Sequence, residues 1–333
     1  MTLLDTRPLR SSPAFRRLWL GTSWSAVGAQ FTVVAVLFQV WQLTGSTAAV
    51  GAVGLAQAVP MVVFGLAGGS LADAVDRRRL VLLSTSGQLL SAALLAAQAL
   101  AGLRSIAILL TLVVVHAACA ALGAPARRTL AARLLPKDQV AAGIALTQLS
   151  FQVAMLVGPA AAGVVAAAWG VGACYALDTL PFGAAVYGGL GLPALRPLGE
   201  VSQPGARTIA TGWRFIATQP VLGGAFATDL LATLLAMPIA VFPAINDERF
   251  GGRAETLGLF LSAIALGGIA AGAASGRATQ AARPGVVMLA AAGVWGLGLA
   301  GFGLAQQLWL ALGWLAVAGA ADVFAAPPAA GAA

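Results

Sequence analysis

A short polar stretch between two long apolar runs reads Gly69-Ser70-Leu71-Ala72-Asp73-Ala74-Val75-Asp76-Arg77-Arg78-Arg79. A glycine lets a helix end and turn closely. A carboxylate at that helix end, here Asp73, can accept charge-assisted hydrogen bonds. The pattern predicts a charged turn between two membrane helices that acts as a lock at one face. The alternative is a plain loop whose arginines only orient the helices.

The composition sets the fold class. Of the 333 residues, 59% are hydrophobic and 9% are charged, and the mean hydropathy is +0.90. Soluble domains carry roughly 25% charged residues, so a soluble globular protein is excluded. A membrane-spanning helix needs about 20 apolar residues. We therefore predict an all-α integral membrane protein with ten spanning helices, over residues 18–41, 47–71, 80–101, 104–123, 139–167, 170–191, 216–243, 257–276, 285–304 and 307–324.

The basic residues predict the orientation of these helices. If the N-terminus is cytosolic and the helices alternate, only Arg104, Arg249 and Arg253 of the 19 basic residues fall outside. The remaining sixteen lie in cytosolic segments, as the positive-inside bias requires. The net charge of +8 is therefore attributed to topology, and nucleic acid is not expected as a partner.

The longest polar stretch, residues 195–214, divides the chain after six predicted helices. Many secondary transporters are built from helical halves that are related as repeats. We predict a six-helix bundle over 1–194, a cytosolic linker over 195–214 and an incomplete four-helix bundle over 215–324. A low-complexity tail follows over 325–333.

Signatures of soluble enzymes and of metal sites are missing from the sequence. There is no G-x-x-x-x-G-K-[ST], G-x-S-x-G or H-E-x-x-H pattern. One histidine and two cysteines cannot complete a four-ligand zinc site. We expect no enzyme activity, no catalytic residue, no metal and no cofactor.

A second motif, Val157-Gly158-Pro159-Ala160-Ala161-Ala162-Gly163, lies within the predicted span 139–167. Proline in a helix removes a backbone hydrogen bond and bends the helix, and Gly158 and Gly163 allow a neighbouring helix to approach closely. Ordinary packing of small residues is the alternative.

The first motif resembles the G-x-L-a-D-r-x-x-R-[KR] signature of the major facilitator superfamily, matched at Gly69, Leu71, Asp73, Arg77 and Arg78. At position 74 an alanine replaces the arginine of the signature, and at position 76 an aspartate replaces its glycine. The second motif resembles the superfamily's G-x-x-x-G-P-x-x-G-G exporter signature, matched at Gly158, Pro159 and Gly163. Residues 12–16, 212–215 and 282–285 resemble the enterobactin (siderophore) exporter branch.

The resemblance implies a twelve-helix fold with a gate between two halves, and proton-coupled export of siderophores or other small amphipathic molecules. Ten of the twelve helices are expected here, because apolar sequence ends near Val323.

Polar residues within the apolar runs are candidates for proton coupling, because an ionisable group in a membrane is costly and needs a reason. The candidates are Asp229, His116, Asp178 and Asp322. A satisfied hydrogen bond between helices is the alternative for each, and a solvated outer mouth is a further one for Asp178.

Other polar and aromatic residues in the runs have a second interpretation. Gln57, Gln88, Gln148 and Gln152 could line a cavity or join helices. Trp19 and Trp41 are interpreted as interfacial anchors.

Together these features predict a multi-pass, monomeric transporter of the bacterial cytoplasmic membrane. Its partners are the lipid bilayer, protons and a small-molecule substrate. The alternative is a truncated, non-transporting membrane protein or helical scaffold.

Overall fold

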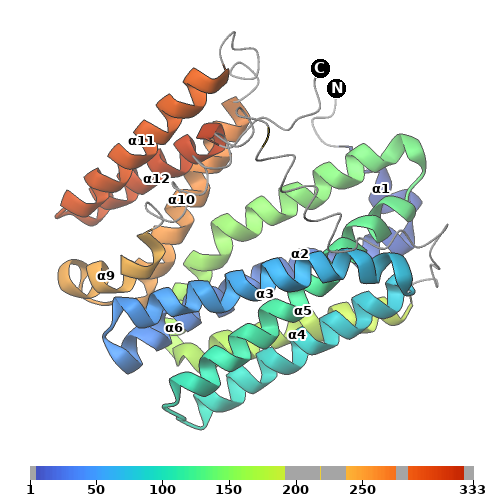
Figure 1. Cartoon of the computed structure of the whole chain (residues 1–333), viewed down its shortest axis with the longest axis horizontal. Coiled ribbons are helices and arrows are strands. Elements are labelled where there is room, and N and C mark those ends of the chain that lie inside the picture. The colour runs from blue at the N-terminus through green and yellow to red at the C-terminus, as the bar shows by residue number, and fades with distance from the viewer. Residues whose placement is uncertain (1–4, 192–217, 219–237, 275–283, 326–333) are drawn as a thin grey trace. The chain divides into compact units, whose positions relative to one another are not determined.

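The structure is a computed structural model that describes residues 5–191, 218, 238–274 and 284–325 (Figure 1). Every regular element in these ranges is a helix. The chain divides into two compact units, residues 1–203 and 204–333. The predicted all-α membrane fold is confirmed. The finer boundaries stay predictions, and the linker 195–214 and most of the tail 325–333 lie outside the described residues.

Unit 1 is a bundle of long antiparallel helices. It contains α1 (Arg7–Ser11), α2 (Pro13–Thr44), α3 (Thr47–Ala74), α4 (Arg77–Leu100), α5 (Ile106–Arg133), η1 (Lys137–Gln139) and α6 (Val140–Leu190). The helix α6 is two spanning segments joined at Gly170, whose φ of 81° breaks the helical path. Polar side chains cap three of the helices, because Ser12, Asp76 and Ser105 accept hydrogen bonds from the first turns of α2, α4 and α5.

The predicted spans correspond closely to helices. Residues 18–41, 47–71, 80–101 and 104–123 fall in α2 to α5, and 139–167 and 170–191 are the two segments of α6. The helix α5 continues ten residues past the predicted end at 123, because Pro125 is accommodated inside the helix instead of ending it. The predicted span 216–243 lies mostly outside the described residues.

Glycines set how closely the helices of unit 1 approach. A Cβ at Gly158 of α6 would lie 2.6 Å from Cβ of Gln30, on α2. A Cβ at Gly172 would lie 2.8 Å from Cδ2 of Leu100, at the end of α4. The helices α2 and α4 both pack against α6.

Unit 2 contains η2 (Pro238–Val241), α9 (Phe242–Phe250), α10 (Ala254–Ala274), α11 (Pro284–Leu304) and α12 (Leu308–Ala325). The predicted spans 257–276, 285–304 and 307–324 correspond to the last three helices. The short helix α9 is not predicted by hydropathy, because it carries Asn246, Asp247, Glu248 and Arg249. Three buried phenylalanines, Phe242, Phe260 and Phe302, pack edge to face at 5.2–5.6 Å and join α9, α10 and α11.

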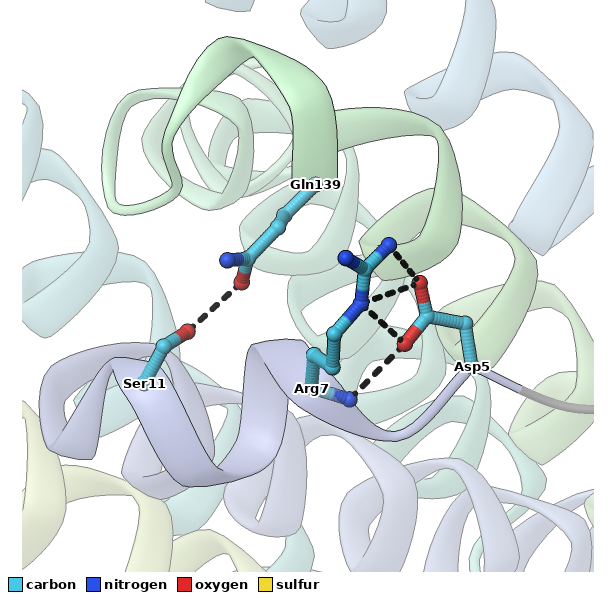
Figure 2. Close-up of polar contacts among 4 residues, drawn as sticks. All are labelled: Asp5, Arg7, Ser11 and Gln139. Carbon is cyan, nitrogen blue, oxygen red and sulfur yellow. Dashed lines mark hydrogen bonds and ion pairs between the residues drawn. The ribbon is translucent and has the colours of Figure 1, made fainter.

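Polar contacts order the first described residues, and one of them joins α1 to the rest of the bundle (Figure 2). Arg7 donates hydrogen bonds to the Asp5 carboxylate at 2.6–3.0 Å. These bonds hold the pKa of Asp5 below its ordinary value. Ser11 donates to Oε1 of Gln139 at 2.6 Å and links α1 to the turn between α5 and α6.

Candidate transport cavity

The path of the chain gives unit 1 two distinct ends. At one end α2, α4 and α6 begin and α3 and α5 end, and α6 returns there at Leu190. Arg78 confirms this arrangement, because its Nη2 donates to the carbonyl of Leu190 at 2.5 Å. Arg17, Arg78, Arg128 and Lys137 gather at this end, and we call it the basic end.

A cavity of about 490 Å³ lies in the half of unit 1 nearest the basic end. Its wall is formed by α2, α4, α5 and both segments of α6. The aromatic rings in the wall belong to Phe15, Trp19, Phe151 and Phe182. Between them lie the hydroxyl groups of Thr22, Ser23, Ser25, Thr85, Thr147 and Ser150. The wall is thus mostly apolar with scattered hydrogen-bonding groups, which is typical of small-molecule sites.

Two of the four candidate glutamines line this cavity. Gln88 of α4 and Gln148 of α6 belong to its wall, whereas Gln57 and Gln152 do not. The interpretation of Trp19 as an interfacial anchor stays a prediction, and the structure adds a second role for its side chain. Its ring lines the cavity and packs against a buried cluster of Phe15, Leu135 and Leu146.

The charged residues of the wall are all basic. They are Arg17, Arg127 and Arg128, and no described aspartate or glutamate lines the cavity. Arg17 and Arg128 are exposed, whereas Arg127 is half-buried in α5. The sequence indicated these arginines only as determinants of topology.

The carboxylate of Asp178 is fully buried, with 0% exposure. Thr32 of α2 donates to its Oδ2 at 2.6 Å, and Oδ1 has no hydrogen-bond partner among the described residues. A solvated outer mouth is therefore wrong for this residue. Ala29 and Phe182 line the cavity, and Thr32 and Asp178 each lie about one helical turn beyond them.

His116 of α5 reaches the cavity through two wall residues. Its Nδ1 lies 3.0 Å from Oγ of Ser91, which donates to the carbonyl of Gln88 at 2.9 Å. Its ring packs edge-on against Phe182, with the centroids 5.6 Å apart. His116 thus contacts Phe182 from α5, and Asp178 lies one helical turn before Phe182 on α6.

A further buried network was missed by sequence reasoning. Gln39 of α2 exchanges hydrogen bonds of 3.1–3.3 Å with Gln98 of α4, and Tyr175 of α6 donates to Oε1 of Gln39 at 2.8 Å. The only signal was an amide or phenol inside an apolar run. Such a signal does not reveal a partner 59 or 136 residues away.

The first motif, residues 69–79, which we call the gate motif, lies at the basic end. Gly69, Leu71 and Asp73 fall in the last turns of α3, where the side chains lie outside the described part of the structure. Arg77 is buried. Asp76, which replaces a glycine of the signature, caps α4 by accepting a hydrogen bond from the backbone N–H of Arg78 at 2.9 Å.

The second motif, residues 157–163, lies on the face of α6 that meets α2. Gly158, Pro159 and Gly163 are all buried. Gly158 is the contact point with Gln30 of α2.

The other two acidic candidates from the sequence are Asp229 and Asp322. Asp229 lies outside the described residues. Asp322 is exposed in the last turn of α12, in unit 2.

Comparison with known proteins identifies the family. Residues 5–333 match the transmembrane secretion effector family of the major facilitator superfamily. The chain belongs to this family. It is a multi-pass transporter of the bacterial inner membrane, and its described helices include seven that are long and apolar enough to cross a bilayer.

Enterobactin exporters are among its relatives. The protein from Shigella boydii serotype 18 is 29% identical over 287 residues, which cover 86% of this chain and 69% of the relative. The enterobactin exporter of Escherichia coli O139:H28 is 28% identical over the same shares.

Solved transporters share the fold. A bacterial homolog of the lysosomal transporter Spinster has a TM-score of 0.67 at 17% identity, covering 96% of this chain and 74% of that one. The nucleoside transporter NupG has a TM-score of 0.72 at 10% identity, covering 93% and 80%.

Proposed function

We propose that this chain is a proton-coupled exporter of a siderophore or a similar small amphipathic molecule. The observation that carries the proposal is the 490 Å³ cavity with the buried pair Asp178–Thr32 one turn beyond its wall. A mostly apolar wall suits an amphipathic solute. Relatives named as enterobactin exporters favour a siderophore and the outward direction.

The proposed cycle is alternating access between two helical halves, with the N-terminus and the basic end in the cytosol. The chain works as a monomer. Substrate enters the cavity from the cytosol while Asp178 loses its proton to that side. After the change of conformation the substrate leaves outward and Asp178 takes a proton from outside. A buried acid can serve in this way because its proton affinity depends on which side supplies water and hydrogen bonds.

Each candidate group has a place in this proposal. Asp178 is preferred because it is buried and accepts a hydrogen bond from Thr32, and His116 is second because its ring packs against Phe182 of the cavity wall. Asp229 remains a third candidate from the sequence. The gate residues Asp73, Arg77 and Arg78, with Gly69 and Leu71, would close the cytosolic side, and Gly158, Pro159 and Gly163 would allow α2 and α6 to remain in close contact.

Proton movement in proteoliposomes tests the function. The purified chain is reconstituted with a pH-sensitive dye inside, and an enterobactin gradient is imposed. The wild type should move protons against the flow of enterobactin. Asp178→Asn should abolish this movement while enterobactin binding persists, since the amide has nearly the same size but cannot ionise. Asp138→Asn, an exposed acid in η1, is the matched control and should behave as wild type.

Different outcomes discriminate between the candidates. Coupled proton movement by Asp178→Asn would remove Asp178, and the same assay on His116→Gln and Asp229→Asn would identify the coupling group. If the wild type moves no protons with enterobactin, the transport proposal fails. The alternative of a non-transporting helical scaffold would then stand.

A further inference from the structure

The half-buried arginine in the cavity wall needs a counter-charge that the described residues do not supply. Nη2 of Arg127 donates to the carbonyl of Ala120 at 2.9 Å, and Nη1 lies 3.5 Å from Oγ of Ser84. Both partners are neutral. A guanidinium carries five N–H donors, so these contacts use a minority of them. A cation in a membrane-spanning segment is costly and usually has an anionic or water-filled partner region.

The position of Arg127 is built into α5. Pro125 has no N–H, and a proline within a helix disturbs the hydrogen-bond ladder of the preceding turn. Arg127 folds back over that turn to reach Ala120. Gly123 leaves room for it and for Ser84 of α4, because a Cβ there would overlap Oγ of Ser84 and would lie 2.5 Å from Nη1 of Arg127. The hydrogen bond to Ala120 and the space at Gly123 thus place the guanidinium in the wall of the cavity.

We infer that the cavity binds an amphipathic anion and that Arg127 is the residue that recognises its carboxylate or other oxyanion group. The wall carries three arginines and, among the described residues, no acid. Arg17 and Arg128 are exposed, so solvent and salt screen their attraction. Arg127 is shielded and therefore discriminates most strongly. The rings of Trp19, Phe151 and Phe182 would hold the apolar body of the ligand.

This inference rests on the proposed function only in treating the anion as a transported substrate. Binding can be measured without transport, with the full chain in detergent. The probes are dansylglycine and its methyl ester, which share one fluorophore and differ by a negative charge. The wild type should bind the acid more tightly than the ester. Arg127→Gln should weaken acid binding about ten-fold and leave ester binding unchanged, as expected for one lost charge-assisted hydrogen bond.

The chain offers a matched control and a second variant. Arg16→Gln removes the same charge from α2 at an exposed position that does not line the cavity, and it should change neither affinity. Gly123→Ala keeps the charge but displaces the guanidinium together with its partner Ser84, and it should weaken acid binding as Arg127→Gln does. Equal binding of acid and ester by the wild type, or equal effects of Arg127→Gln and Arg16→Gln, would overturn the inference.

A lipid headgroup is the other source of an anion. If phosphatidylglycerol displaces dansylglycine from the wild type, phosphatidylcholine does not, and Arg127→Gln removes the difference, the site belongs to a lipid and the substrate assignment is overturned. Selective acid binding without enterobactin-dependent proton movement would refute the proposed function but support the anion site. Enterobactin-dependent proton movement without selective acid binding would support the proposed function and refute the anion site.

Discussion

The contact between α2 and α6 at Gly158 makes a sharp prediction about stability. A methyl group at this position would lie 2.6 Å from Cβ of Gln30 and 2.7 Å from its Cγ. Non-bonded carbon atoms pack at about 3.5–4.0 Å. Because Cβ of Gln30 is fixed to the backbone of α2, a change of rotamer cannot relieve the overlap. Gly158→Ala therefore forces the two helices apart by roughly 1 Å.

The expected cost follows from this overlap. Overpacking of a close contact destabilises by about 1–3 kcal/mol. The same substitution at Gly183, also in α6, should not, because a Cβ there meets nothing within 4 Å. Alanine is favoured over glycine in a helix by roughly 0.8–1.0 kcal/mol, so Gly183→Ala should be neutral or stabilising.

Thermal denaturation of the purified protein in detergent measures the difference. Gly158→Ala should melt several degrees below wild type and Gly183→Ala at or above it. Gln30→Gly in the Gly158→Ala background removes the opposing Cβ and should recover part of the loss, as a double-mutant cycle would record. If Gly158→Ala and Gly183→Ala melt together, the close approach of α2 and α6 is not as described, and the packing role of the motif is refuted.

Further predictions concern topology, a helix cap and the buried acid. With the native cysteines replaced, Arg104→Cys should react with an impermeant maleimide on intact cells and Lys137→Cys only after lysis, and the reverse pattern would overturn the proposed orientation. Asp76→Ala should lower stability by about 1 kcal/mol in thermal melts and Asp76→Gly by only a few tenths, and equal losses would contradict the capping role. Thr32→Val should cost about 1–3 kcal/mol because Oδ2 of Asp178 loses its donor, whereas Thr32→Ser should retain most of the stability, and matching melts would argue against the bond.

The sequence predicted the helices well because each membrane span needs a long apolar run and basic residues mark the joints. It could not predict which faces meet. Lipid and protein interior are equally apolar, so buried and lipid-facing positions carry the same residue types. On α4, Leu80 is 5% exposed and Leu83 is 72% exposed, although both are leucines in one run. The cavity, which depends on the facing sides of several helices, was therefore not predictable.

The buried polar residues were predictable as candidates but not as pairs. Asp178 and His116 are conspicuous because an ionisable group in an apolar run demands a reason. Thr32 is not conspicuous, since a threonine hydroxyl can bond its own helix and needs no distant partner. The pairing of Thr32 with Asp178 depends on the register of α2 against α6. That register is set by close contacts at positions such as Gly21 and Gly158.

Arg127 and Arg128 show most clearly what the sequence could not predict, namely which of two adjacent basic residues is shielded in the cavity wall. The positive-inside bias counts basic residues near span ends, so it treats these adjacent arginines as equivalent. They differ in the structure because adjacent helical residues point about 100° apart, and only Arg127 is shielded by the cavity wall. A residue that served topology alone would cost less in the loop after Arg133, where water solvates the charge. Its place within α5, two residues after Pro125 and four residues after Gly123, is explained better by a ligand that needs a cation there.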